Sequence, residues 1–211
     1  MIHETKPADM ILKGTTTIGI VCSNGVALAT DTRATMGYFV AHKKAKKVYK
    51  IYDKLAMTIA GTVADAQAVV ETLKANAQLY YLEKGRAMPV KSAARLVANL
   101  LFSSRYIPLS LQALVAGVDE SGSHIYALDP FGSVTEEKCV STGSGSPIAY
   151  GLLESEYREN LSIDDGVNLI VRAIHSSMKR DSASGDSFDV ATITDEGYHE
   201  LSDEEKKRLA Q

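Results

Sequence analysis

The segment Leu12–Cys22 reads LKGTTTIGIVC and is the first strand-like part of this 211-residue chain. Three threonines follow Gly14, and β-branched residues continue behind them, as is typical of the start of a strand. Asn24-Gly25 comes directly afterwards and indicates a hairpin turn into a second strand over 26–32. The opening of the chain therefore predicts an antiparallel pair of strands, with hydroxyl groups gathered where the first strand begins.

The remaining sequence consists of blocks of strands separated by pairs of helices. We expect strands over 15–22, 26–32, 47–52, 55–61, 112–119, 123–129, 133–140, 189–194 and 198–202, and helices over 64–84, 89–106, 147–159 and 163–179, with a short helix in the charged tail 203–211. The residues expected to face the core from the first two helices are Ala66, Val69, Val70, Leu73, Ala77, Ala93, Val97 and Leu100. This order is not a βαβ alternation, so it predicts an α+β domain in which helices cover the outer faces of antiparallel sheets.

The composition is that of an ordinary globular protein, with 45% hydrophobic and 23% charged residues and a net charge of −3. This charge gives no reason to expect binding to nucleic acid or to an anionic membrane. Residues 1–14 lack the apolar core of a secretory signal, and no apolar run approaches the length of a membrane span. Cys22 and Cys139 are too few for a disulfide framework and sit in apolar stretches, where cysteine acts as a small hydrophobe. We therefore expect a single-domain cytoplasmic protein.

Several familiar chemistries find no support in the sequence. The five histidines form no HxxxH or HxH pair, so no metal site is expected, and there is no G-x-S-x-G motif of an α/β-hydrolase. STGSGSP, at 141–147, precedes a helix but lacks the G-K-[ST] ending of a phosphate-binding loop, which favours a helix-capping loop. RDSASGD, at 180–186, places two serines and two aspartates on one turn, and this pattern fits either a helix C-terminal loop or a functional cluster.

Thr15 is the candidate nucleophile among the three threonines. A threonine hydroxyl needs a base within hydrogen-bond reach, and a chain that begins at threonine supplies one, because its α-amino group titrates near pH 7.7–8.0. Gly14 is the least hindered residue at which a cleavage could expose that amine. The alternative is that the threonines only begin a strand, as β-branched residues often do. We predict this ordinary strand role for Thr16 and Thr17.

The register of the first hairpin decides where Asp31 lies. A three-residue loop, with Gly25 in a left-handed conformation, pairs Cys22 with Val26 and places Asp31 opposite Thr17, on the face that also carries Thr15. A two-residue loop would turn Asp31 to the other face. The functional interpretation therefore predicts the three-residue loop.

Lys47 begins the strand KVYKIY and could pair with Asp31, in which case its cation would favour the deprotonated amine and hydroxyl of Thr15. The alternative is a solvent-exposed charge of the basic run KKAKK, which is what we expect of Lys43, Lys44 and Lys46.

Six blocks together resemble the β subunits of proteasomes, most closely the archaeal kind: GTTTIGI, ATDTRAT, the Lys47 strand, MTIAGTVADAQ, STGSGSPIAYGLLES and RDSASGDSFDVATIT. The resemblance extends from Gly14 to about Thr194. It implies an N-terminal nucleophile hydrolase, an αββα sandwich of two antiparallel sheets between helical layers. It also implies that a propeptide, residues 1–14, is removed by autocleavage between Gly14 and Thr15, leaving a catalytic domain over 15–211.

By this resemblance Thr15 is both nucleophile and base, Asp31 and Lys47 complete the catalytic group, and the Gly61 N–H binds the oxyanion. The implied polar network around the Thr15 amine is Ser144, Asp181 and Ser184. Thr35 would pair with an extended substrate through its backbone. The implied lining of the substrate pocket is Ala34, Ala45, Tyr49, Ile59, Val63 and Gln67. This lining carries no acid or base, so we expect a chymotrypsin-like preference for cleavage after bulky apolar residues.

The resemblance also implies partners: proteasome α subunits, other β subunits in heptameric rings, an ATP-dependent unfoldase that acts through the α ring, and unfolded polypeptides as substrates. No metal or other cofactor is implied for the subunit itself. A non-catalytic β subunit would lack part of the group formed by Thr15, Asp31 and Lys47. An α subunit would carry an N-terminal helix, and the bacterial hexameric threonine protease fits the two glycine-rich loops less well. A phosphate-binding module is the remaining alternative.

Overall fold

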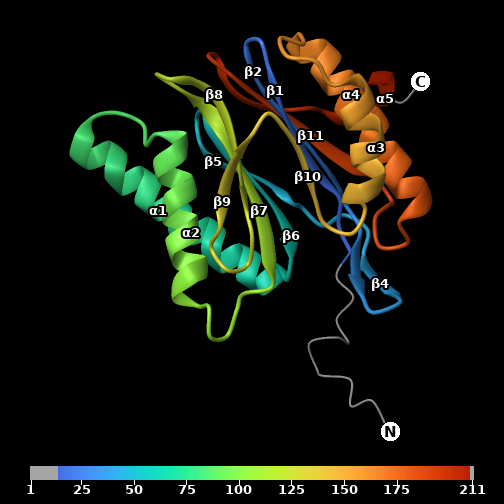
Figure 1. Cartoon of the computed structure of the whole chain (residues 1–211), viewed down its shortest axis with the longest axis horizontal. Coiled ribbons are helices and arrows are strands. Elements are labelled where there is room, and N and C mark those ends of the chain that lie inside the picture. Colours follow the sequence, from blue (N-terminus) through green and yellow to red (C-terminus); the bar gives the residue numbers. More distant parts are fainter. Residues whose placement is uncertain (1–13, 210–211) are drawn as a thin grey trace, which may run out of the picture.

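The computed structural model describes residues 14–209, which form four layers (Figure 1). Helices α1 (Val63–Lys84) and α2 (Val90–Ser103) cover one five-stranded sheet, and α3 (Ser146–Glu156) and α4 (Ile163–Arg180) cover the other. The two sheets pack face to face between the helical layers. The expected α+β sandwich is therefore confirmed. The N-terminal strand is an interior strand of its sheet, the second of five.

Both large sheets are antiparallel throughout. One has the order β10-β1-β2-β11-β12 and the other the order β5-β6-β7-β8-β9, while β3 and β4 form a separate hairpin. The strands are β1 (Thr17–Cys22), β2 (Gly25–Asp31), β3 (Ala34–Met36), β4 (Phe39–His42), β5 (Val48–Tyr52), β6 (Leu55–Gly61), β7 (Leu111–Asp119), β8 (Gly122–Leu128), β9 (Val134–Glu137), β10 (Cys139–Thr142), β11 (Phe188–Thr194) and β12 (Gly197–Glu200). A short helix α5 (Asp203–Leu209) closes the described chain, as expected, and the last two residues of the predicted tail lie outside it.

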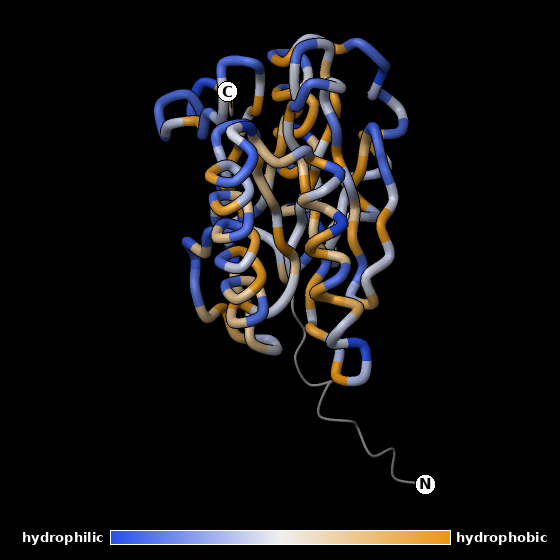
Figure 2. Tube along the Cα trace, turned by 90° about the vertical axis from the view of Figure 1, so that its left-hand side faces the viewer, coloured by the Kyte–Doolittle hydropathy of each residue, from blue (hydrophilic) through white to orange (hydrophobic). Residues whose placement is uncertain are grey.

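Three apolar layers hold the sandwich together: one under α1 and α2, one under α3 and α4, and one between the sheets. The five residues predicted to form the inner face of α1 are the five that are buried. On α2 the prediction is wrong in one position, because Leu100 is only partly buried and Leu101 is fully buried. Figure 2, which views the molecule from the α1 and α2 side, shows hydrophilic and hydrophobic residues alternating along these helices.

The predicted register of the first hairpin is wrong. Cys22 pairs with Gly25, so the loop has two residues, Ser23 and Asn24, and Thr17 lies opposite Thr30 rather than Asp31. Gly25 serves a different purpose from the one expected, because a Cβ atom there would lie 2.3 Å from the carbonyl oxygen of Ile193 in the neighbouring strand. The glycine is required by the close approach of β11 and not by a left-handed turn.

The strand predicted over 133–140 is in fact two strands in two different sheets. β9 pairs with β8, the chain crosses between the sheets at Lys138, and β10 then pairs with β1. The hairpin of β3 and β4 was not predicted. It contributes Ala34, Thr35 and Met36 to the lining of a cavity beside Thr15.

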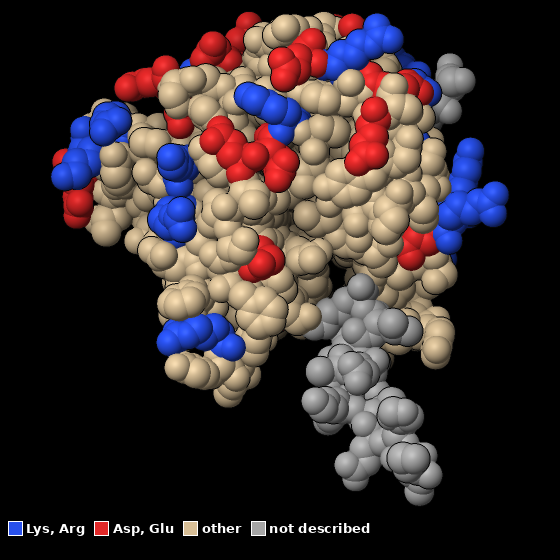
Figure 3. Space-filling view, viewed as in Figure 1, with Lys and Arg blue, Asp and Glu red and all other residues tan. Residues whose placement is uncertain are grey.

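Both cysteines are free and contribute to apolar packing, and burial raises the pKa of each thiol to about 12. No helix within residues 14–209 is long and apolar enough to cross a membrane. The same residues hold no cluster of three or more His, Cys, Asp or Glu side chains able to bind a metal ion. On the face shown in Figure 3, basic and acidic side chains are interspersed.

Candidate active site

Asp31 is a fully buried carboxylate at the end of β2, and four donors converge on it. Oδ1 accepts from the Thr16 backbone N–H at 2.9 Å and from Lys47 Nζ at 2.8 Å. Oδ2 accepts from the backbone N–H groups of Arg33 and Gly185, each at 3.0 Å. These four donors satisfy the buried carboxylate, which links the start of β1, the end of β2, the start of β5 and the loop after α4.

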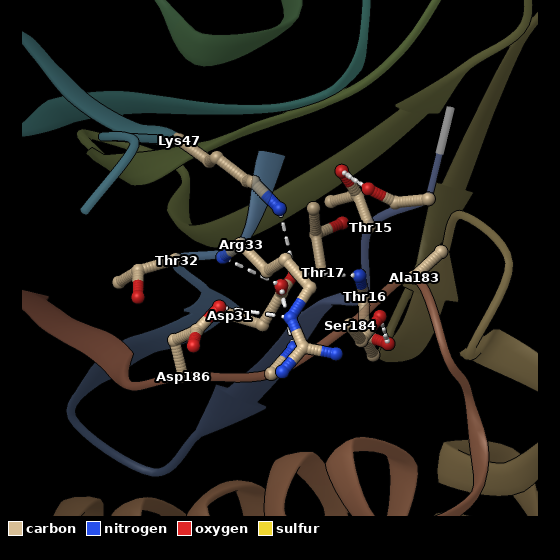
Figure 4. Close-up of polar contacts among 12 residues, drawn as sticks. Thr15, Thr16, Thr17, Asp31, Thr32, Arg33, Lys47, Ala183, Ser184 and Asp186 are labelled. Atoms are coloured by element: carbon tan, nitrogen blue, oxygen red, sulfur yellow. Dashed lines mark hydrogen bonds and ion pairs between the residues drawn. The ribbon is translucent and has the colours of Figure 1, made fainter. Parts of the chain in front are cut away.

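Lys47 immediately precedes β5 and points across to the carboxylate of Asp31 (Figure 4). Its side chain is 9% exposed, in contrast to those of Lys43, Lys44 and Lys46, which are exposed residues as predicted. Burial lowers the pKa of Lys47 below the usual lysine range, although the Asp31 carboxylate opposes that shift. The site therefore holds a desolvated cation whose proton is easier to remove than that of a surface lysine.

Lys47 pairs with Asp31, as the sequence suggested, although the register predicted to place Asp31 on the face of Thr15 was wrong. Thr15 and Lys47 both lie outside the regular strands, just before β1 and β5, so strict alternation does not determine which way they point. Asp31 is the last residue of β2, where the loops converge.

Thr15 is 5% exposed and lies between Gly14 and the STGSGSP loop at 141–147. Its hydroxyl donates to the carbonyl oxygen of Gly14 at 2.6 Å, and its backbone N–H donates to Ser144 Oγ at 3.2 Å. The hydroxyl therefore lies beside the carbonyl of the peptide bond at which cleavage was predicted.

A chain of hydroxyl groups and one carboxylate leads from the Thr15 nitrogen to the Thr16 hydroxyl. Ser144 and Ser184 each donate to Asp181 Oδ2 at 2.6 Å. The Thr16 hydroxyl is 2.8 Å from Ser184 Oγ, and it is the donor because Ser184 donates to Asp181. The structure thus joins Ser144, Asp181 and Ser184 in one network, which contacts Thr15 through Ser144 and Thr16 through Ser184. The prediction that Thr16 is an ordinary strand residue is wrong, because it precedes β1 and belongs to this network.

Gly14 is held tightly against the loop after α4. A Cβ atom on Gly14 would lie 1.6 Å from the Cβ of Ala183, and the Gly14 N–H donates to Thr35 Oγ1 at 3.4 Å. Glycine at this position is therefore required by packing as well as by access to its carbonyl. Of the predicted propeptide, only Gly14 lies within the described residues.

A cavity of about 350 Å³ opens beside Thr15, within the usual range for ligand pockets. Thr15, Lys47 and Gly61 all line this cavity. Of the predicted substrate-binding residues, it is lined by Ala34, Thr35, Ala45, Tyr49, Ile59 and Val63. Gln67 lies instead in an adjacent cavity that shares Ala45, Lys46, Tyr49 and Val63 with this one. Met36, from the β3–β4 hairpin, also lines the cavity and was not predicted from the sequence.

Gly61 ends β6 at a point of close contact between strands. A Cβ atom there would lie 2.0 Å from the carbonyl oxygen of Ser110, so no other residue fits without displacing backbone. Gly61 faces the same cavity as Thr15. A backbone N–H at the cavity wall is the type of donor that stabilises an oxyanion.

Arg33 has a structural role in the site that was not predicted from the sequence. Its guanidinium donates to Asp186 at 2.8 Å and to the carbonyl oxygen of Ser182 at 2.9 Å, which fastens the RDSASGD loop to the end of β2 (Figure 4). The pKa of Asp186 is lowered by this hydrogen bond. The arginine in ATDTRAT, two residues after Asp31, was the available signal, but only the fold shows its partners.

The chain was compared with known proteins. The family described as "Proteasome subunit" matches residues 11–193. A protein named "Proteasome subunit beta" from Ferroglobus placidus is 52% identical over 206 residues, covering 97% of this chain and 96% of the relative. Proteins of the same name from Methanosarcina mazei and Methanothermobacter thermautotrophicus are each 50% identical over 200 residues, covering 94% of this chain and 95% of each relative.

These matches show that the chain belongs to the proteasome subunit family, and within it to the β subunits of the 20S core. The assembly built by this family, in which α subunits take part, is a protease. The resemblance drawn from the six sequence blocks is thereby confirmed.

Proposed function

We propose that this chain is a threonine endopeptidase subunit whose nucleophile is Thr15, freed when residues 1–14 are removed by autocleavage at Gly14–Thr15. The observation that carries the proposal is the position of the Thr15 hydroxyl, 2.6 Å from the Gly14 carbonyl oxygen and in the same cavity as Lys47 and Gly61. In the uncleaved chain the Thr15 nitrogen is part of an amide, so it cannot act as a base. The precursor is therefore inactive towards other substrates.

In the mature subunit, Thr15 Oγ attacks the carbonyl carbon of a substrate peptide while its proton passes to the α-amine of the same residue. The Gly61 N–H holds the oxyanion that forms. Collapse of the tetrahedral intermediate breaks the C–N bond, and the protonated amine gives its proton to the departing amine of the substrate. Water then hydrolyses the ester on Thr15, and the hydroxyl regains its proton.

The surrounding groups have supporting roles in this scheme. The Lys47 cation, held by Asp31, favours the deprotonated forms of the Thr15 amine and hydroxyl. Ser144, Asp181 and Ser184 orient the amine through the hydrogen bonds described above. Thr35 lies beside the cavity on the short strand β3, where an extended substrate could add as a further strand.

Cleavage of the precursor can be followed by intact mass after assembly with α subunits. We expect a product that begins at Thr15. Gly14→Ala should slow its formation by roughly tenfold or more, because the added methyl group would collide with Ala183, and overpacking of this kind costs about 1–3 kcal/mol.

Gly151→Ala is the matched control, since a Cβ atom at Gly151 meets nothing within 4 Å, and its processing rate should equal that of the unsubstituted chain. An active assembly that retains the full-length chain would rule out Thr15 as the nucleophile.

The cavity suggests which substrates are preferred. It is lined by small or apolar residues near Thr15, and its charged members among the residues that the structure describes are Lys46 and Lys47. We therefore propose cleavage after bulky apolar residues. Assembled particles should hydrolyse peptides with leucine or aromatic P1 residues at least about tenfold faster than those with acidic P1 residues, because burial of a large apolar side chain contributes about 1.5–3 kcal/mol. A preference for acidic P1 residues would contradict this assignment.

The proposal extends to the assembly. Two inner rings of seven β subunits, capped by α rings, would enclose the active sites, and an ATP-dependent unfoldase acting through the α ring would deliver unfolded polypeptides. We place this assembly in the cytoplasm. Enclosure and the propeptide would both protect other proteins, the first by restricting access to the site and the second by blocking the Thr15 amine until assembly.

A further inference from the structure

The loop Gly143–Gly145 runs closely along the backbone of Thr15. Ser144 contacts the Thr15 nitrogen, and the Gly145 N–H donates to the Thr15 carbonyl oxygen at 3.4 Å. Gly143 has a φ of +90°, and a Cβ atom on it would lie 2.0 Å from that same carbonyl oxygen. The path of this loop therefore determines where the Ser144 hydroxyl meets the nucleophile.

Gln112 fastens this loop from the opposite sheet. The loop follows β10, which pairs with β1, whereas Gln112 belongs to β7 in the other sheet. The Gly143 N–H donates to Gln112 Oε1 at 3.2 Å. One side chain thus links the two halves of the sandwich at the point where both contribute to the site.

The position of Gln112 also connects the loop to the proposed oxyanion donor. Gln112 lies directly opposite Ala60 in the ladder of β6 and β7, one residue before Gly61. A second cavity, of about 400 Å³, is lined by Gln112, Gly143, Ser144 and Gly61, and shares only Gly61 with the substrate cavity. The Gln112 side chain therefore reaches from β7, the strand paired with that of the oxyanion donor, to the loop that contacts the Thr15 nitrogen.

We infer that Gln112 is a positioning residue for the reaction: through Gly143 it holds the Ser144 hydroxyl against the Thr15 amine, beside the Gly61 strand. This inference rests on the proposed function, because it matters for catalysis only if Thr15 is the nucleophile. Gln112 is not part of the substrate cavity, so its loss should act on turnover and not on substrate binding.

The test compares Gln112→Leu, which has similar volume but no acceptor, with Gln112→Glu, which keeps an acceptor oxygen at the same reach. In particles assembled with α subunits, rates are normalised to the fraction of chains that begin at Thr15, measured by intact mass. Gln112→Leu should lower kcat by roughly five- to tenfold, the loss expected for one hydrogen bond, with KM changed by less than about twofold. Gln112→Glu should recover most of the rate.

Gln78→Leu is the matched control, since Gln78 is an exposed residue of α1, and it should leave kcat unchanged. Hydrogen exchange gives a second measurement that does not depend on assembly. In the full-length chain, exchange at the Gly143 amide should accelerate at least about fivefold in Gln112→Leu but not in Gln112→Glu.

Unchanged kcat or unchanged Gly143 exchange in Gln112→Leu would overturn the inference, as would a loss that appears only in KM or that Gln112→Glu fails to recover. The two proposals fail in different ways. Activity that survives Thr15→Ala overturns the proposed nucleophile, whereas a fully active Gln112→Leu in a particle that Thr15→Ala inactivates overturns only the role of Gln112.

Discussion

Replacing Thr15 by alanine should abolish peptide hydrolysis, by at least about 10³-fold, and should leave residues 1–14 attached after assembly with α subunits. Both effects have one cause: the hydroxyl that lies beside the Gly14 carbonyl in the precursor is the hydroxyl proposed to attack substrates later. The measurements are turnover of a fluorogenic peptide and intact mass on the same particles.

Two further variants sharpen this result. Thr15→Ser keeps the hydroxyl, so peptide turnover and removal of residues 1–14 should both stay within about tenfold of the unsubstituted rates. The lost methyl group helps to hold the hydroxyl in place, and its removal should raise the activation free energy by roughly 1 kcal/mol. Thr17→Val is the matched control two residues away. It removes the hydroxyl that bonds to Thr142 at 2.7 Å, costs about 1 kcal/mol of stability, and should leave turnover nearly unchanged. Activity in Thr15→Ala would refute the mechanism.

Lys47→Met should lower kcat by roughly 10²- to 10⁴-fold, because it removes the cation that favours deprotonation at Thr15 and leaves the buried Asp31 carboxylate without its ionic partner. Lys50→Met is the matched control. Lys50 lies in β5, three residues further along, and forms an exposed ion pair with Asp53 at 3.0 Å, so its loss should change kcat by less than about twofold. Activity of Lys47→Met within tenfold of the unsubstituted particle would contradict the proposed role.

The lowered pKa of Lys47 also predicts how stability depends on pH. The folded chain releases the Lys47 proton at a lower pH than the unfolded chain, where the lysine pKa is about 10.4. Between these two pKa values the unfolded chain binds more protons, so the free energy of unfolding gains a contribution that rises with pH through this window. That contribution should be missing from Lys47→Met. Unfolding midpoints measured across the alkaline range for both chains would show it as a difference that grows with pH.

Much of the fold follows from local patterns. Periodicity identified β5, β6 and β7, all four large helices and the buried face of α1, because each of these elements has one clear apolar pattern and a well-marked end. The division of 133–140 between two sheets was missed, since EEKCV contains no glycine or proline at the crossing, and which neighbour a strand pairs with is a long-range property.

The hairpin register shows why part of the site could not be derived in the same way. Every residue of β2 is buried, because one face packs on the opposite sheet and the other on α4. A strand buried on both sides has no polar face, so its sequence does not record which way each side chain points. The choice between a two-residue and a three-residue loop was therefore open in the sequence, and the packing of Gly25 against Ile193 decides it.

The sequence by itself determined the α+β class and marked Thr15, Asp31 and Lys47 as candidates, because these depend on residue types at fixed local spacings. Its resemblance to proteasome β subunits implied the family and the four-layer sandwich. Only the tertiary structure decided which distant residues form hydrogen bonds with one another in the site. Ser144 reaches Thr15, and Ser184 reaches Thr16, across more than 100 residues of chain, and Asp181 joins the two serines. Arg33 fastens the loop that carries Asp181 and Ser184, and Gln112 reaches Gly143 from the other sheet. Contacts of this kind depend on how separate sheets pack, and local sequence patterns carry no record of that packing.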